Sequence, residues 1–298
     1  MKTAIRSDGR VVRVEEIAPA KVNLILSVGK KRPDGYHEIV SLMETVSLSD
    51  KLTFSVEDDL LPGIKLSVSG KYSVPEDSSN LVIRAAEAFF SKIGRRFAVS
   101  VQLEKNVPTE AGLGGGSSDA AATIRALNAI AGKPLSEDGL LALAASVGAD
   151  VAFCLSGGTA ICTGIGEKIE QIESPAHRFY AVVKGADRVS TPEAYRALDE
   201  IGGRMTDPPV KTDLVELAHG GRIALFNDFE RVVFPVCPGI AGIKARLLSL
   251  GARDALMSGS GAAVFGLFPD AASAEKAAAS FPDADAFAVE SVARYAPL

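Results

Sequence analysis

The sequence predicts an α+β fold of two domains, and three observations support this. The chain has 298 residues, which suits two ordinary domains or one large unit. Apolar residues recur along it with both the strand period of two and the helix period of 3.6. The expected strands often follow one another directly instead of alternating with helices. Glycines at 157, 158, 164 and 166 mark turns, and we expect a boundary there, with domains 1–163 and 164–298.

The first domain is expected to combine strands with three capped or glycine-bounded helices. A helix over 80–93 is favoured because Asn80 suits an N-cap and Gly94 supplies a stop. A helix over 136–147 is favoured by Ser136 as its cap. The remaining expected elements are strands at 11–14, 22–28, 46–56, 64–68, 97–103, 151–155 and 158–163, and a helix at 118–130.

The second domain follows the same mixed pattern. A helix is expected to begin at Thr191, because Pro192 then occupies its first turn. The other expected elements are strands at 179–184, 254–257, 262–268 and 286–291, and helices at 210–218, 238–250 and 271–280.

Charge and composition exclude several classes of function. The net charge is −5, so the basic footprint that nucleic acid or an anionic membrane attracts is missing. The three cysteines have no paired spacing, so neither a disulfide framework nor a zinc site is expected. No signal peptide or membrane-spanning run is found, and we expect a soluble, cytoplasmic protein.

A glycine-rich segment carries the clearest chemical signal. It runs Pro108, Thr109, Glu110, Ala111, Gly112, Leu113, Gly114, Gly115, Gly116, Ser117, Ser118 and leads into an alanine-rich helix. Glycines let a backbone turn its N–H groups toward a ligand, and a helix N-terminus favours phosphate. The segment is neither a Walker P-loop nor a dinucleotide fingerprint. The alternative is a flexible surface turn.

Three further segments each have a functional and a structural interpretation. Lys21 and Asn23 alternate with apolar residues and share one strand face, although a strand lysine is usually solvated. Asp150 stands between a helix end and an apolar run, where it could cap a turn. The small-residue segment 256–262 could form a tight hairpin.

Taken in order, these segments resemble the three motifs of the GHMP small-molecule kinases. The motifs are Pro-Ala-Lys21-Val-Asn23-Leu, then the glycine-rich segment, then Ser258-Gly-Ser-Gly-Ala-Ala-Val-Phe. Two further segments make the resemblance more specific. They are Arg32-Pro-Asp-Gly-Tyr36-His37 and Ser156-Gly-Gly-Thr-Ala. They resemble the 4-diphosphocytidyl-2-C-methyl-D-erythritol kinase branch of that family, which belongs to the non-mevalonate route to isoprenoid precursors.

The resemblance implies a two-domain GHMP kinase fold with the active site between the domains. It implies transfer of the ATP γ-phosphoryl group to the 2-hydroxyl of a cytidine-diphosphate-linked polyol, with Mg²⁺ arriving on the nucleotide. Residues 108–118 would bind ATP, with Ser117 or Ser118 near the phosphate or Mg²⁺. Asp150 would be the catalytic base, and Lys21 would lie beside it and keep it ionised.

The resemblance also implies a cytidine site. Tyr36 would stack on the base, His37 would bind its pairing edge, and Tyr195 would close the opposite face; Asn23 is included among the substrate-binding residues. No protein metal ligand is certain, and we expect a monomer or homodimer that binds neither nucleic acid nor membrane. Two alternatives remain: another GHMP kinase, acting on mevalonate, homoserine or a sugar, and a non-catalytic nucleotide-binding relative.

Overall fold

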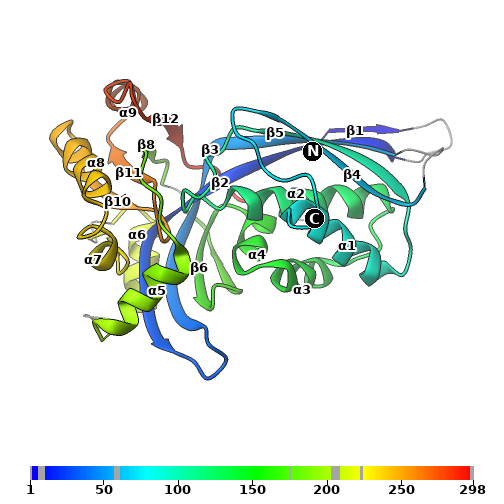
Figure 1. The fold of residues 1–298 in the computed structure, drawn as a ribbon, viewed down its shortest axis with the longest axis horizontal. Coiled ribbons are helices and arrows are strands. Elements are labelled where there is room, and N and C mark those ends of the chain that lie inside the picture. The colour runs from blue at the N-terminus through cyan, green and yellow to red at the C-terminus, as the bar shows by residue number, and fades with distance from the viewer. Residues whose placement is uncertain are drawn as a thin grey trace.

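The computed structural model describes residues 2–5, 11–56, 61–174, 176–202, 209–221 and 224–295. It has the predicted α+β architecture, built on two β-sheets. One end of the elongated molecule carries β1–β5 with helices α1–α4, and the other carries helices α5–α9 (Figure 1). None of the helices in these ranges is long and apolar enough to cross a membrane.

A long antiparallel hairpin forms the spine of the first sheet. Its strands are β2 (Val11–Lys31) and β3 (His37–Val56). Along the path β1-β2-β3-β5-β4 the other strands are β1 (Lys2–Ile5), β5 (Ala98–Lys105) and β4 (Gly63–Gly70). Three more join it: β6 (Thr159–Gly164) on β3, β7 (Lys168–Ile172) on β6, and β9 (Phe226–Asn227) on β2. The first sheet therefore extends to Ile172, and the predicted boundary at 163–164 stays a prediction.

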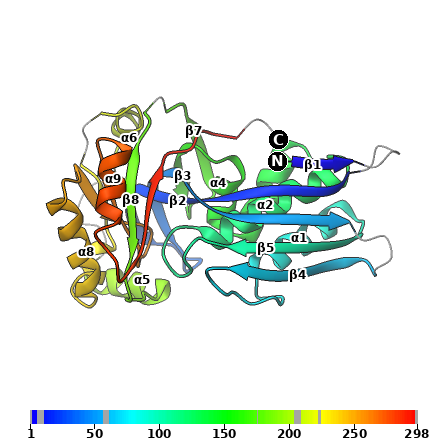
Figure 2. The same ribbon diagram turned by 90° about the horizontal axis from the view of Figure 1, so that it is seen from above.

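Four helices cover one face of this sheet (Figure 2). They are α1 (Leu81–Ile93), α2 (Gly115–Ile130), α3 (Glu137–Val147) and α4 (Ala149–Ser156). The Asn80 side chain caps α1 by accepting from the Val82 N–H, and Gly94 ends it in the left-handed region. Phe54, Phe89, Ile124 and Phe153 are buried between sheet and helices, so α2 is fixed in the middle of the layer.

The second sheet has the order β10-β11-β8-β12 and is antiparallel throughout. Its strands are β8 (Phe179–Lys184), β10 (Asp254–Met257), β11 (Val264–Phe268) and β12 (Asp285–Glu290). The helices around it are α5 (Thr191–Glu200), α6 (Lys211–Ala218), α7 (Glu230–Val233), α8 (Pro238–Ser249) and α9 (Ala271–Ala278).

The two sheets share a core at the middle of the β2–β3 hairpin. Val22 and Leu42 from the hairpin lie in one buried cluster with Tyr180 and Phe265 from the second sheet. Past β12 the chain returns to the first sheet, where Ser291 bridges Val46 and the Val292 N–H donates to the Thr45 carbonyl at 2.9 Å. The second sheet is therefore held against the β2–β3 hairpin, whose strand β2 carries Lys21.

Several predicted elements need correction. The segment 151–155 was expected to be a strand but belongs to helix α4. Strand β2 runs straight through Pro19, with a register shift between Pro19 and Lys21 instead of a break. Helix α2 begins at Gly115, three residues before the expected start. An apolar run of five residues fits a buried strand and a buried helix equally. The length of the run 151–155 therefore could not distinguish the two.

Candidate active site

Lys21 and Asn23 occupy a short irregular stretch of β2. Register shifts lie on both sides of it, between Pro19 and Lys21 and between Asn23 and Ile25, and such bulges re-aim side chains. The two side chains share a face as predicted, because Lys21 Nζ donates to Asn23 Oδ1 at 2.7 Å. Lys21 is only 4% exposed, so the usual solvated position of a strand lysine does not apply.

Asp150 lies in the first turn of α4 and faces Lys21. The distance from Lys21 Nζ to Asp150 Oδ2 is 3.5 Å, and the aspartate remains about one-third exposed. Gly148 precedes the helix and the Asp150 side chain does not cap it. The carboxylate is thus directed toward the lysine and solvent, as a group that meets a substrate requires.

Helix α2 begins in the glycine-rich segment. Gly114 is its N-cap, with φ of 68°, and the first N–H groups of any helix lack partners within it. Here those groups belong to Gly115, Gly116 and Ser117. A Cβ on Gly114 would lie 2.9 Å from Lys21 Cγ, and one on Gly115 would lie 2.9 Å from Val107 Cγ1. Glycine at these positions allows the helix start to reach the lysine.

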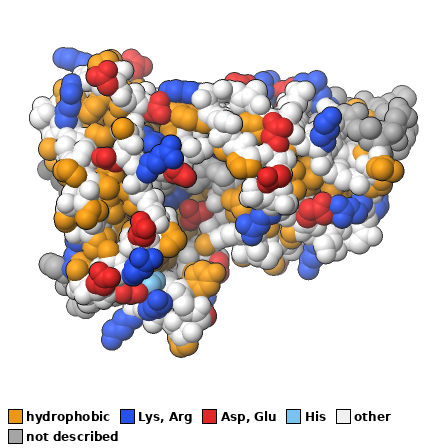
Figure 3. Space-filling view, viewed as in Figure 1, with side chains coloured by type: hydrophobic (Ala, Val, Ile, Leu, Met, Phe, Trp, Pro, Cys, Tyr) orange, Lys and Arg blue, Asp and Glu red, His pale blue; other side chains and the backbone are white. Residues whose placement is uncertain are grey.

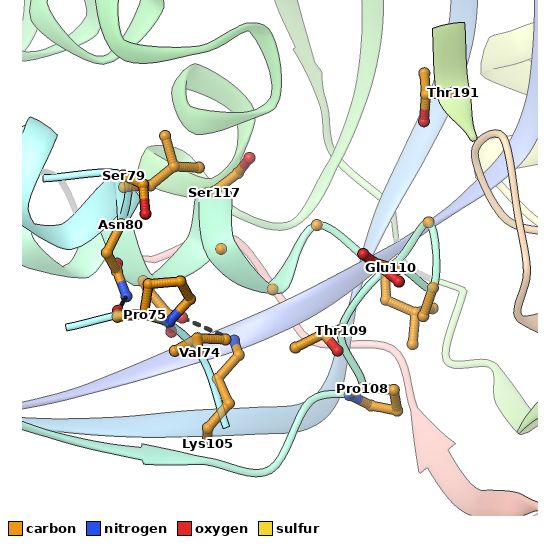
Figure 4. Close-up of a pocket in the computed structure, with 18 residues that line it drawn as sticks. Val74, Pro75, Ser79, Asn80, Lys105, Pro108, Thr109, Glu110, Ser117 and Thr191 are labelled. Carbon is orange, nitrogen blue, oxygen red and sulfur yellow. Dashed lines mark hydrogen bonds and ion pairs between the residues drawn. The ribbon is translucent and has the colours of Figure 1, made fainter. Parts of the chain in front are cut away.

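A cavity of about 580 Å³ opens over this helix start. Every residue from Pro108 to Ser117 lines it (Figure 4), whereas Ser118 is buried and is not among the lining residues. Thr191 approaches from the other end of the molecule, and the surface is hollowed between the two ends (Figure 3). The structure adds lining residues that the sequence did not assign to a site: Val74, Pro75, Ser79, Asn80, Leu81, Lys105, Asp119 and Thr191.

A loop of the second sheet supports the glycine-rich segment from behind. Residues 258–263 connect β10 to β11 as the expected hairpin. Ser258 Oγ donates to the Gly112 carbonyl at 2.9 Å, and the Gly259 N–H donates to Asn23 Oδ1 at 3.0 Å. A Cβ on Gly112 would lie 2.0 Å from the Ser258 carbonyl oxygen. Asn23 therefore joins Lys21 to this loop, a positioning contact that sequence spacing could not show.

Three buried charges meet at the cavity, and two of them, Lys105 and Asp119, line it. Lys105 (Figure 4) donates through Nζ to a carboxylate oxygen of Asp50 and, at 2.7 Å, to Asp119 Oδ2. Asp50 also accepts from the Asn106 and Val107 N–H groups, whereas Asp119 Oδ1 has no partner among the residues that the structure describes. Burial, with the charge of Asp50, raises the pKa of Asp119. Asp50 is thus the better stabilised anion of the two.

The residues predicted for the cytidine site lie where β2 turns into β3. Tyr36 follows the turn and is 60% exposed, while His37 begins β3 and is buried. The Tyr195 ring stacks on His37 with centroids 4.8 Å apart and planes 21° apart. Burial, and secondarily the charge of Asp150, raises the pKa of Tyr195 to about 12. The structure thus brings Tyr195 to His37, and Tyr195 lies within the electrostatic range of Asp150.

Comparison with known proteins gives a consistent result. The model described as "GHMP kinases N terminal domain" matches residues 80–158, and "GHMP kinases C terminal" matches 210–285. The chain is 41% identical to the 4-diphosphocytidyl-2-C-methyl-D-erythritol kinase of Desulfitobacterium hafniense, covering 90% of this chain and 91% of that protein. It is 42% identical to the protein of the same name from Bacillus subtilis, covering 86% and 88%.

Solved structures give the same result for the fold. A crystal structure of 4-(cytidine 5'-diphospho)-2C-methyl-D-erythritol kinase superposes with a TM-score of 0.81 at 37% identity, covering 93% of this chain and 99% of that one. A homoserine kinase from Cytophaga hutchinsonii superposes with a TM-score of 0.69 at 18% identity, covering 98% of each chain. At that identity the second likeness concerns the fold alone.

Proposed function

This chain belongs to the 4-diphosphocytidyl-2-C-methyl-D-erythritol kinase family of GHMP kinases, and from that premise we propose the roles of its site residues. The chain is an ATP-dependent small-molecule kinase. It phosphorylates the 2-hydroxyl of 4-diphosphocytidyl-2-C-methyl-D-erythritol, in the non-mevalonate pathway. Relatives of that name at 41% and 42% identity support this assignment along most of the chain.

We place the nucleotide in the 580 Å³ cavity over the start of α2. The N–H groups of Gly115, Gly116 and Ser117 are available to phosphate oxygens, and the positive end of the helix dipole favours the same charge. Mg²⁺ enters as part of the nucleotide substrate. In the described residues no group of three acidic, histidine or cysteine side chains could hold a metal ion, so phosphate oxygens are proposed as its main ligands.

Asp150 is the proposed base. It accepts the proton of the 2-hydroxyl as the oxygen forms its bond to the γ-phosphorus and the bond to ADP breaks. Phosphoryl transfer depends on positioning and on stabilising charge, and Lys21 supplies a buried cation 3.5 Å from Asp150. The single observation that carries this proposal is the pair of Lys21 and Asp150. It lies beside the glycine-rich segment, at the point where Gly114 contacts the lysine.

The cytidine end of the substrate is proposed to lie at Tyr36, His37 and Tyr195. The stacked His37 and Tyr195 rings support a site for a flat base, and base stacking on an aromatic ring contributes about 1–3 kcal/mol.

An assay of phosphate transfer from labelled ATP tests the proposal. The cytidine compound, mevalonate and homoserine should be compared as acceptors, and only the first should be phosphorylated efficiently. Asp150→Asn should lower kcat by about 10²–10⁴-fold, the usual contribution of a positioned base, and should leave ATP affinity nearly constant. Near wild-type turnover in the variant would remove Asp150 from the role of base.

A further inference from the structure

Asp199 makes an unusually direct contact with His37. It lies in the last turn of α5, four residues after Tyr195, so both side chains project from one face of the helix. The distance between Asp199 Oδ1 and His37 Nε2 is 2.7 Å. The His37 ring is only 6% exposed, while Asp199 is 36% exposed. One helix therefore presents a stacking ring and a carboxylate to the same imidazole.

This contact determines where the imidazole carries its proton. A carboxylate can only accept a hydrogen bond, so His37 Nε2 must be the donor. In the neutral ring Nδ1 is then an acceptor, and it has no hydrogen-bond partner among the residues that the structure describes. The pKa of Asp199 is lowered, chiefly by this hydrogen bond, which agrees with a carboxylate that stays ionised.

The stacking geometry shows what Nδ1 can meet. The imidazole lies nearly parallel to Tyr195 with a centroid separation of 4.8 Å, typical of offset stacking. A base that stacks on the same face of Tyr195 beside His37 is coplanar with the imidazole. The two rings then meet edge to edge, as paired bases do.

Cytosine and uracil differ at the ring edge that would face Nδ1. Cytosine carries an amino donor at position 4, whereas the uracil-type ring carries a carbonyl acceptor there. An acceptor at Nδ1 pairs with the amino group and repels the carbonyl. A site whose buried acceptor is left unpaired discriminates strongly against the wrong ligand.

We propose that Asp199 is a specificity-determining positioning residue: by keeping the His37 proton on Nε2, it presents Nδ1 as an acceptor to the cytosine amino group. The proposal rests on the cytidine substrate argued above. It assigns Asp199 a part in choosing the base and none in the phosphoryl transfer itself.

Two variants of Asp199 test this, with Lys31→Met as the control. Asp199→Asn removes the charge at nearly constant size, and Asp199→Leu removes every hydrogen-bonding atom. The control removes the ammonium that lies 3.6 Å from the other Asp199 oxygen and keeps the backbone pairing of Lys31 with His37. The measured quantity is the ratio of kcat/KM for the cytidine compound to kcat/KM for its uridine analogue.

We expect the Leu variant to lose about 5- to 150-fold of this ratio, the range for one unsatisfied buried group, and the Asn variant less. The loss should appear in KM for the cytidine compound, while KM for ATP and the ratio of the Lys31→Met control stay at wild-type values. Wild-type ratios in both Asp199 variants would overturn the proposal and leave the kinase assignment intact. A wild-type enzyme that ignores the cytidine compound would overturn both.

Nitrogen-15 spectra of histidine-labelled protein give an independent readout. The chain has three histidines, and His37→Gln identifies the signal of His37. A proton on Nε2 and none on Nδ1 is expected in the wild type, with a mixture of tautomers in Asp199→Leu. A wild-type His37 protonated on Nδ1 would overturn the proposal even if the substrate ratios behaved as expected.

Discussion

Gly114 lies at the meeting point of two parts of the candidate site, the start of α2 and Lys21. Its φ of 68° lies in the left-handed region, and it caps the start of α2 while lying against Lys21, which faces Asp150. A larger residue at this position would disturb both the nucleotide and Lys21. Its neighbour Gly116 has no such constraint, because a Cβ there would meet only Leu81 Cδ1 at an ordinary 3.5 Å.

Alanine substitutions at the two positions should therefore differ. Gly114→Ala should cost about 1–3 kcal/mol of unfolding free energy, because a left-handed non-glycine residue is strained. It should also lower kcat, because the new Cβ would lie 2.9 Å from Lys21 Cγ. Gly116→Ala should leave the unfolding free energy unchanged or raise it by up to about 1 kcal/mol, and it should lower kcat less. Urea unfolding and steady-state kinetics measure the two effects, and equal losses in both variants would contradict this account.

At the scale of single residues, the sequence predicted which side chains share a face, but it did not predict their contacts with distant residues. Lys21 and Asn23 sharing one face followed from alternation, and the hydrogen bond between them confirms it. The ties of Asn23 to Gly259 and of His37 to Asp199 join residues more than 160 positions apart. Such contacts depend on how the two sheets pack, and no local pattern carries that information.

Among the elements, α2 shows how tertiary packing overrides local propensity. Its first turn contains Gly115 and Gly116, which destabilise a helix by roughly 1 kcal/mol each relative to alanine, so the sequence predicted a later start. The structure starts the helix at Gly115. There the absence of a side chain lets the turn pack against Val107. The caps of α1 and α3 were predictable, because Asn80 and Ser136 act within their own turns.

The buried aspartate of α2 gives this element a pH dependence. Because the pKa of Asp119 is raised in the folded state, chiefly by burial, the folded protein holds this proton more tightly than the unfolded chain. Its stabilising contribution is present below the ordinary carboxyl pKa near 4 and is lost as pH rises through the raised pKa.

Asp119→Asn should remove that dependence. The difference in unfolding free energy between variant and wild type should shift in favour of the variant as pH rises above about 5. Asp50→Asn is the comparison: it alters the anion that accepts two backbone N–H groups and should destabilise by about 3–5 kcal/mol. Because it also removes a charge that helps to raise the pKa of Asp119, it should weaken the pH dependence without abolishing it. Parallel stability curves for Asp119→Asn and wild type would contradict the raised pKa.

At the scale of the whole molecule, the C-terminal tail fastens the second sheet to the first. Beyond the bridge at Ser291, Arg294 pairs with Gly157, and the Tyr295 N–H donates to the Ser156 carbonyl at 3.0 Å. The Arg125 guanidinium lies 4.7 Å from the centroid of the Tyr295 ring. These contacts lie at the C-terminal end of α4, the helix whose first turn carries Asp150.

Ending the chain at Glu290 should therefore cost about 2–5 kcal/mol, from several backbone hydrogen bonds and one cation–π contact. Kcat should fall together with stability, since α4 loses its support. Tyr295→Phe keeps the ring over Arg125 and should stay near wild type, whereas Tyr295→Ala should show part of the loss. Urea unfolding measures this series, and a truncated chain as stable as the full one would refute the supporting role.

The position of the tail in the chain also determines when its contacts can form during synthesis. Domains emerge and fold from the N-terminus during synthesis, at about 5–20 residues per second, so β3, α2 and α4 are available long before residues 291–295 exist. Their carbonyls at Thr45 and Ser156 wait for donors that are translated after every other partner described here. The helices around the glycine-rich segment can thus pack early, while α4, which carries Asp150, receives the hydrogen bond at Ser156 only after residue 295 has been synthesised.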